Sequence, residues 1–304
     1  MSAIKSVVAT INGQQYTLTL NSNTGAYEAS ITAPTETSFH VNDGHYYPVT
    51  IKATDISGNS TTIDDTDVVF GEDLQLRVKE TVKPTVAFVS PTDGAGLTNN
   101  KPTFKVNVLD EGSGIDLSTF KLTVGADVLL IADCTYKEIT NGYEISYTPE
   151  TALADGSHNI KAEVSDNDGN AATAATITIK VDTVPPTLTV LTPENDTFTN
   201  VAGCTVSGVT NDITSSPVEV MIELNGVEVG AATVQSDGSF SKLINLRNGE
   251  NTIVITATDA LGKSTSVTRT VTLDTSAPEF TAVSIAPNPV NAGATYTISV
   301  KVTP

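Results

Sequence analysis

The side chains in this sequence that could carry chemistry are mostly carboxylates. There are 35 Asp and Glu residues against 16 Lys and Arg, with three histidines and two cysteines. His40, His45 and His158 have neither zinc-site spacing nor the setting of a nucleophile and its base. No glycine-rich phosphate loop leads from a strand into a helix. These patterns predict a protein that is not an enzyme.

Four aspartates form the candidate ligand set for a cation. Asp55, Asp166, Asp168 and Asp182 stand in turns and linkers that should lie near the ends of folded units. Hard cations such as Ca²⁺ take oxygen ligands, and several carboxylates can gather at such ends. The alternative is that these side chains cap turns and face solvent, because no complete calcium-loop spacing is present. Calcium is thus a candidate ligand, and we expect no other cofactor.

Composition narrows the classes of partner. The net charge of -19 disfavours nucleic acid and anionic membranes, and no apolar stretch is long enough for a membrane span. The absence of Trp counts against a sugar-stacking platform. Residues 1–5 show no basic and apolar leader pattern, so we expect no secretory signal peptide.

The elements that must position these residues follow a pattern that occurs three times, in segments 44–59, 156–170 and 249–263. Each segment alternates apolar and polar residues, which predicts a half-buried strand. An Asp-x-x-Gly turn follows, and in the second segment residues 176–181 alternate again as a returning strand. The apolar positions are Val49, Ile51 and Ala53; Ile160, Ala162 and Val164; and Ile253, Ile255 and Ala257. At the start of these strands, His158 aligns with Tyr47 and Asn251, and we expect a polar tip there to contact nearby backbone.

A linker also repeats, with Thr81, Thr183 and Thr275 each followed by a proline three residues later. Proline cannot donate to a strand ladder, so each linker marks a boundary. The spacing predicts an all-β chain of tandem immunoglobulin-like β-sandwich modules. We name them module 1 (1–83), module 2 (84–184), module 3 (185–276) and the C-terminal tail (277–304). Cys134 and Cys204 then fall in different modules, which predicts small buried side chains and no disulfide within a module.

The two ends of the chain differ from its middle. Module 2 opens with predicted strands at 85–90 and 103–110, and module 3 with strands at 187–192 and 204–209. Module 1 begins almost directly at its Asn12-Gly13 hairpin, which matches Asn225-Gly226 of module 3. The tail has a strand pair, 280–285 and 295–302, and nothing after it. Either module 1 is a shorter variant, or the tail of one chain completes module 1 of another and forms a homo-oligomer.

Several motifs resemble known families. The Asp166–Asn170 turn and the Val181–Pro186 linker resemble bacterial Ig-like repeats of surface adhesins and extracellular enzymes. Module 3, with Asn225-Gly226 and Gly238-Ser239-Phe240, resembles the accessory Ig-like domain of glucodextranase-type enzymes. Module 1, through residues 9–13, 27–29 and 32–35, resembles Ig-like modules in tail proteins of phages and prophages of Gram-positive bacteria, and residues 287–293 have the same character.

These resemblances imply a structural or adhesive role. We expect a component of a phage or phage-like particle, on its tail, baseplate or an appendage, located in virions assembled in the host cytoplasm. Its expected partners are other virion proteins and a glycan or protein of the host surface. The alternatives are a bacterial cell-surface adhesin or stalk, and an accessory region of a secreted glycosidase. The missing leader and wall anchor favour the virion.

Overall fold

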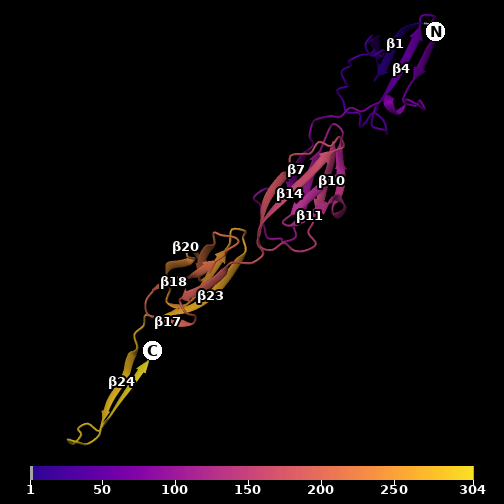
Figure 1. Cartoon of the computed structure of the whole chain (residues 1–304). Coiled ribbons are helices and arrows are strands. Elements are labelled where there is room, and N and C mark those ends of the chain that lie inside the picture. The colour runs from indigo at the N-terminus through magenta and orange to yellow at the C-terminus, as the bar shows by residue number, and fades with distance from the viewer. Residues whose placement is uncertain (1–2, 304) are drawn as a thin grey trace. The chain divides into compact units, whose positions relative to one another are not determined.

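The computed structural model describes residues 3–303, whose regular secondary structure is almost entirely β-strand, mostly in antiparallel pairs (Figure 1). The chain divides into two compact units, Met1–Val181 and Asp182–Pro304. Unit 1 contains module 1 and the strands of module 2, and unit 2 contains module 3 and the C-terminal tail. Among the described residues, no helix is long and apolar enough to cross a membrane.

Module 1 is a single sheet with the strand order β3-β2-β1-β4-β5, and β6 also pairs with β4. Its buried apolar side chains are Val7, Ala9, Tyr47 and Leu74. The alternating positions of β4 are half-buried, because the described part of module 1 has no second sheet to cover this face. The strands are β1 (Ile4–Ile11), β2 (Gln14–Leu20), β3 (Tyr27–Glu28), β4 (Tyr47–Asp55), β5 (Ser60–Ile63) and β6 (Gln75–Leu76), with a short 3-10 turn η1 (Glu72–Leu74).

Module 2 is a sandwich of two sheets, β11-β10-β14-β15-β8 and β12-β13-β9-β7. Phe104 and Ile145 of one sheet meet Phe120 and Ile160 of the other in one core, where all four are fully buried. The strands are β7 (Thr85–Ser90), β8 (Gly96–Leu97), β9 (Phe104–Leu109), β10 (Ile115–Val124), β11 (Asp127–Leu130), β12 (Thr135–Ile139), β13 (Gly142–Tyr147), β14 (Gly156–Asp166) and β15 (Ala175–Val181), with a 3-10 turn η2 (Ile131–Asp133).

Module 3 follows one continuous hydrogen-bonded path, β16-β18-β21-β20-β19-β22-β23-β17. β20 pairs with both β19 and β21, so it joins the two faces around a core that includes Val206, Ile222, Ile244 and Ile255. The strands are β16 (Thr187–Thr192), β17 (Thr197–Thr199), β18 (Gly203–Asn211), β19 (Glu219–Leu224), β20 (Val227–Val234), β21 (Ser239–Asn245), β22 (Gly249–Thr258) and β23 (Ser264–Leu273). The predicted all-β, Ig-like sandwich fold is confirmed.

The predicted hairpins form as expected. Asn12 and Gly13 both have positive φ, 47° and 73°, and so do Asn225 and Gly226, 53° and 76°. Two successive residues of this kind make the turn whose twist matches a tight antiparallel hairpin, which is why Asn-Gly is favoured there. These turns join β1 to β2 and β19 to β20.

The residues aligned at the start of the repeated strands all contact upstream backbone, as predicted. His158 Nε2 lies 2.7 Å from Ala154 O, Asn251 Nδ2 donates to Arg247 O at 2.7 Å, and Tyr47 Oη donates to Glu36 O at 3.2 Å. An imidazole, an amide and a phenol therefore play the same part, which is to tie the start of the strand to a backbone carbonyl of the preceding segment.

The opening strands of modules 2 and 3 form as β7 and β9 and as β16 and β18. In the tail, β24 (Glu279–Ala286) and β25 (Thr297–Thr303) pair with each other in a separate two-stranded sheet. All residues of both strands are exposed, including Phe280 at 73% and Val283 at 64%. The tail is thus a ribbon whose apolar side chains lack a covering layer within the described chain.

Candidate functional site

Two clusters of carboxylates stand out among the described residues. Glu80, Asp110 and Asp166 each offer an oxygen within 4.8 Å of the others, and we call them the module 2 cluster. Asp182, Asp212 and Asp259 do the same and form the module 3 cluster. Asp166, Asp182, Asp110 and Asp259 are buried, at 1%, 1%, 8% and 6% exposure. Each cluster lies within one unit of the chain.

The two clusters are built from equivalent positions. Glu80 and Asp182 come directly before the linker threonine, and Asp110 and Asp212 directly follow the second opening strand, β9 or β18. The third member is the aspartate of the repeated Asp-x-x-Gly turn, Asp166 in module 2 and Asp259 in module 3. The repeated fold therefore places three carboxylates together twice.

The turn aspartates are held by their own turns. Asp166 Oδ1 accepts a hydrogen bond from Asn170 N at 2.7 Å, and Asp259 Oδ1 accepts one from Lys263 N at 3.0 Å. Asp55 caps the equivalent turn of module 1 by accepting from Asn59 N at 2.9 Å. The turn thus leaves the second carboxylate oxygen, Oδ2, to make a further contact.

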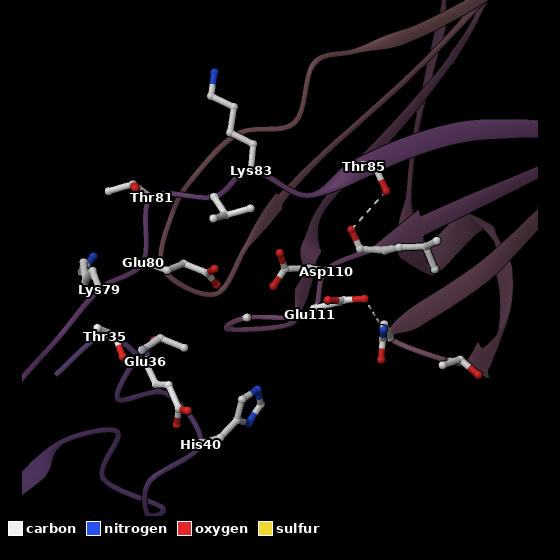
Figure 2. A pocket seen from close by; sticks show the side chains of 16 residues that line it. Thr35, Glu36, His40, Lys79, Glu80, Thr81, Lys83, Thr85, Asp110 and Glu111 are labelled. Carbon is white, nitrogen blue, oxygen red and sulfur yellow. Dashed lines mark hydrogen bonds between the residues drawn. The ribbon is translucent and has the colours of Figure 1, made fainter. Parts of the chain in front are cut away.

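In the module 2 cluster, Asp110 and Glu80 point toward one another (Figure 2). Asp110 Oδ2 accepts from Gly114 N at 2.6 Å, and Glu80 accepts a hydrogen bond from Ser113 N. Burial raises the pKa of Asp110, and together with the charges of Glu80 and Asp166 it outweighs the lowering effect of the Gly114 hydrogen bond. The loop approaches Glu80 closely, so that a Cβ on Gly112 would overlap the Glu80 carboxylate and displace it from its present position.

The module 3 cluster contains a cation of its own, the ammonium group of Lys263. Lys263 Nζ lies 2.8 Å from Asp182 Oδ2 and 3.0 Å from Asp259 Oδ2, and it donates to Asp182 O at 3.0 Å. Burial alone would lower the pKa of Lys263, but the hydrogen bonds and charges of the two aspartates outweigh it and raise that pKa. Burial alone would raise the pKa of Asp259, but its hydrogen bonds and ion pair with Lys263 outweigh it and lower that pKa. The two aspartates and the lysine therefore form an ion group in which one positive charge partly balances two buried negative charges.

The module 2 cluster has an uncharged amide at the same position. Asn170 stands four residues after Asp166, as Lys263 stands four after Asp259. Asn170 Nδ2 donates to Asp166 Oδ2 at 2.8 Å and to Glu80 O at 3.2 Å, so it repeats two contacts of Lys263 without the charge. None of the ion pairs found among residues 3–303 involves Glu80, Asp110 or Asp166.

The four aspartates expected as calcium ligands do not lie together in one group. Asp166 lies in the module 2 cluster, Asp182 lies in the module 3 cluster, and Asp55 joins neither. Asp168 also stays outside, because its Oδ2 accepts from Thr37 Oγ1 at 2.6 Å and from Glu80 N at 3.0 Å. Asp168 therefore fastens the end of module 1 to module 2.

Sequence reasoning missed two members of each cluster and the lysine. It overlooked Glu80, Asp110, Asp212, Asp259 and Lys263. One signal was present in the linkers, since the residue before each linker threonine is acidic: Glu80, Asp182 and Asp274. A second was the shared Asp of the turn, Asp259 in module 3. Asp110 and Asp212 have no such signal, because only the fold brings their loops to the linker.

Two family models match the chain. "Bacterial Ig-like domain" matches residues 83–183, and "Glucodextranase, domain B" matches residues 186–275. Both matches fall on the sandwich strands described above. The chain is an Ig-like repeat protein.

A curated relative of this Ig-like repeat protein is bacillopeptidase F of Bacillus subtilis (strain 168), which is 35% identical over 113 residues. That match covers 37% of this chain and 7% of the protease. The chain therefore corresponds to a small part of that relative's length.

Solved structures with a similar fold include fibronectin(III)-like modules of Clostridium thermocellum CbhA, at 15% identity and a TM-score of 0.36, covering 62% of this chain and 94% of that one. A second is a 1.5-MDa bacterial ice-binding adhesin, at 19% identity and a TM-score of 0.32, covering 90% of this chain and 88% of that one.

Proposed function

We propose that this Ig-like repeat protein is a non-enzymatic spacer that carries contact surfaces within a phage or phage-like particle, on the tail, baseplate or an appendage. The observation that supports the spacer role is that polar side chains at the module ends hold neighbouring segments together through hydrogen bonds and ion pairs. Such contacts oppose the relative motion that short linkers otherwise permit.

In unit 1 the fastening joins module 1 to the repeated turn of module 2. Asp168 accepts hydrogen bonds from Thr37 and from the backbone of Glu80, and Lys79 Nζ donates to Asp168 O at 3.1 Å. A carboxylate that accepts from two segments at once restricts both, because neither can move without breaking a bond to a charged group. In unit 2, Lys263 fastens linker residue Asp182 to the turn of module 3.

Limited trypsin digestion of the full chain tests the spacer role. Lys79 lies next to the fastened backbone of Glu80, and we expect the Asp168→Ala variant to be cleaved after Lys79 several times faster than the parent chain. The Asp127→Ala variant changes an exposed aspartate of the same module, on β11, and serves as the control. Equal cleavage rates for the Asp168→Ala variant and the parent would contradict the spacer role.

The virion setting rests on the likeness of module 1 and of residues 287–293 to Ig-like modules of phage tail proteins. The expected contact surfaces are loops and strand edges, with other virion proteins and a host-surface glycan or protein as partners. The exposed apolar ribbon of the tail is one such surface. Immunogold electron microscopy with an antibody to this chain tests the setting, and we expect label on tailed particles.

An accessory region of a secreted enzyme is the second candidate. The likeness to bacillopeptidase F and to glucodextranase domain B supports it. In that case the antibody would detect the chain within a larger secreted polypeptide and would leave particles unlabelled. Label on the bacterial envelope would instead indicate a cell-surface adhesin or stalk.

A further inference from the structure

The opening strand pairs of modules 2 and 3 show what covers the core face of the repeated strand. In module 2, β7 and β9 pack in one core with β14 of the facing sheet. In module 3, β16 and β18 pack in one core with β22. Under this cover Ile160 and Ala162 of β14, and Ile253 and Ile255 of β22, all have 0% exposure.

The corresponding face of module 1 is open in the described chain. The repeated strand of this module is β4, and its inward residues Val49, Ile51 and Ala53 are only half-buried. Residues 3–83 form one sheet, which contains no opening strand pair. The alternation of β4 therefore matches a cover that these residues do not supply.

Module 1 also has a free edge at the place where an opening pair would join it. Tyr27 and Ile31 follow the Asn-Gly turn at the same spacing as Phe240 and Ile244 of β21. In module 3, β21 pairs with β18, and Phe240 and Ile244 are 3% and 1% exposed. In module 1, β3 is the edge strand of the described sheet and is two residues long, and residues 29–33 form no strand. Tyr27 and Ile31 accordingly stay half-buried.

The C-terminal tail carries a strand pair of the type that module 1 does not show. It follows a Thr-to-Pro linker, as the opening pairs of modules 2 and 3 do, and its two strands pair in the same antiparallel way. Cross-strand partners share one face of a ribbon. One face of this ribbon is apolar and consists of the pairs Phe280 and Val302, Val283 and Val300, and Ile285 and Ile298. In module 2 the cross-strand partners Phe88 and Val106 pack in the core, whereas every residue of the tail ribbon is exposed.

We propose that the tail of one copy docks on module 1 of a second copy, with β25 pairing to residues 27–33 and the apolar face of the ribbon covering β1 and β4. This contact reproduces between two copies what modules 2 and 3 make within one chain. Backbone pairing to an open edge and burial of alternate side chains are the two sources of affinity in strand addition. The proposal goes beyond the spacer role and does not depend on it, because it concerns how copies of the chain join.

The form of the assembly follows from the two surfaces. Each copy carries one tail and one module 1, so the contact joins unlike surfaces and leaves a free one at either end. Such a head-to-tail contact generates rings or open chains rather than a closed dimer. We therefore expect the parent chain to form a series of oligomers that grows with protein concentration.

Sedimentation velocity of the full chain at increasing concentration tests this expectation. The Val300→Asp variant places a charge on the apolar face of the ribbon, and we expect association to weaken at least about 100-fold, because the interface offers no partner for a buried charge. The Ser299→Asp variant changes the neighbouring residue, which faces the other side of the same strand, and it should assemble like the parent.

A second pair of variants tests the surface on module 1. Ile31→Asp changes the position equivalent to buried Ile244 and should also prevent growth, whereas Ser30→Asp changes an exposed neighbour and should not. Circular dichroism spectra establish that each variant is folded. If the ribbons instead paired with each other, Ile31→Asp would assemble like the parent, and this result would overturn the proposal.

Mixing the two blocked chains gives the sharpest readout. The Val300→Asp chain retains an intact module 1, and the Ile31→Asp chain retains an intact tail. Each should be monomeric alone, and together they should form a 1:1 dimer that grows no further. A parent chain that stays monomeric at every concentration, or a mixture that forms no dimer, would overturn the proposal; neither result would alter the digestion test of the spacer role.

Discussion

At the scale of single residues, Lys263 contributes stability because its one positive charge pairs with two buried carboxylates, those of Asp182 and Asp259. We expect the Lys263→Met variant to lose about 3–5 kcal/mol of unfolding free energy in unit 2, the range typical of removing one partner from a buried ion pair. Denaturant unfolding in calcium-free buffer measures this loss. The Lys301→Met variant changes an exposed lysine of the same unit and should remain within about 0.5 kcal/mol of the parent.

The pH dependence of that contribution follows from the two shifted pKa values. The pKa of Asp259 is lowered from 3.8, so its contribution is present above pH 3.8 and is lost as the pH falls through the lowered value. The pKa of Lys263 is raised from 10.5, so its contribution is complete below pH 10.5 and is lost as the pH rises through the raised value. We therefore expect the stability difference between the parent and Lys263→Met to be flat from about pH 5 to 9. A difference that changes steeply near neutral pH would contradict this assignment.

Both cysteines are free thiols, and they are half-buried rather than buried as the sequence predicts. Burial, and then the charge of Asp133, raises the pKa of Cys134 to about 11, and burial raises the pKa of Cys204. At pH 8 about one Cys134 thiol in a thousand is ionised, and the thiolate is the reactive form. We expect slow reaction with a disulfide reagent in the native chain and rapid reaction of both thiols after unfolding. Rapid native-state reaction of Cys134 would show that its surroundings are more open than this.

At the scale of elements, the tail ribbon is separable from the sandwich. β24 and β25 pair with each other and with no other described strand. We therefore expect deletion of residues 277–304 to leave the unfolding midpoint of module 3 unchanged, as measured by thermal denaturation. A large drop in this midpoint would show that the ribbon packs on module 3.

The same deletion tests whether the tail contacts another copy of the chain. An exposed two-stranded ribbon is marginally stable alone, so a partner that covers its apolar face is expected. Sedimentation velocity of the full and shortened chains gives the readout. A smaller assembly after deletion would support association through the tail, and an unchanged one would reject it.

At the scale of the whole molecule, the chain should not unfold in a single step. It contains two compact units, and multidomain chains commonly violate two-state behaviour. We expect scanning calorimetry to resolve at least two transitions, of which the Lys263→Met substitution lowers one. A single transition for the whole chain, lowered as one by this substitution, would contradict the independence of the two units.

Much of the fold could be predicted from local patterns. Alternation at Ile253, Ile255 and Ala257 predicts a strand with one buried face, and Asn225-Gly226 predicts the hairpin beside it, because both depend on neighbouring residues alone. The opening strand pairs could be recognised in the same way. The weak burial of β4 in module 1 could not be predicted from local patterns, because burial depends on whether a second sheet covers that face of the strand.

The sequence by itself determined the strand segments, their turns, the linkers and the acidic residue before each linker threonine. The tertiary structure decided which carboxylates meet. Asp110 lies 30 residues after Glu80 and 56 residues before Asp166 along the chain. Only strand pairing brings the three carboxylates together. The tertiary structure also placed Lys263 in one cluster and Asn170 at the equivalent position of the other. The charge difference between these two residues matters only because buried carboxylates surround both of them.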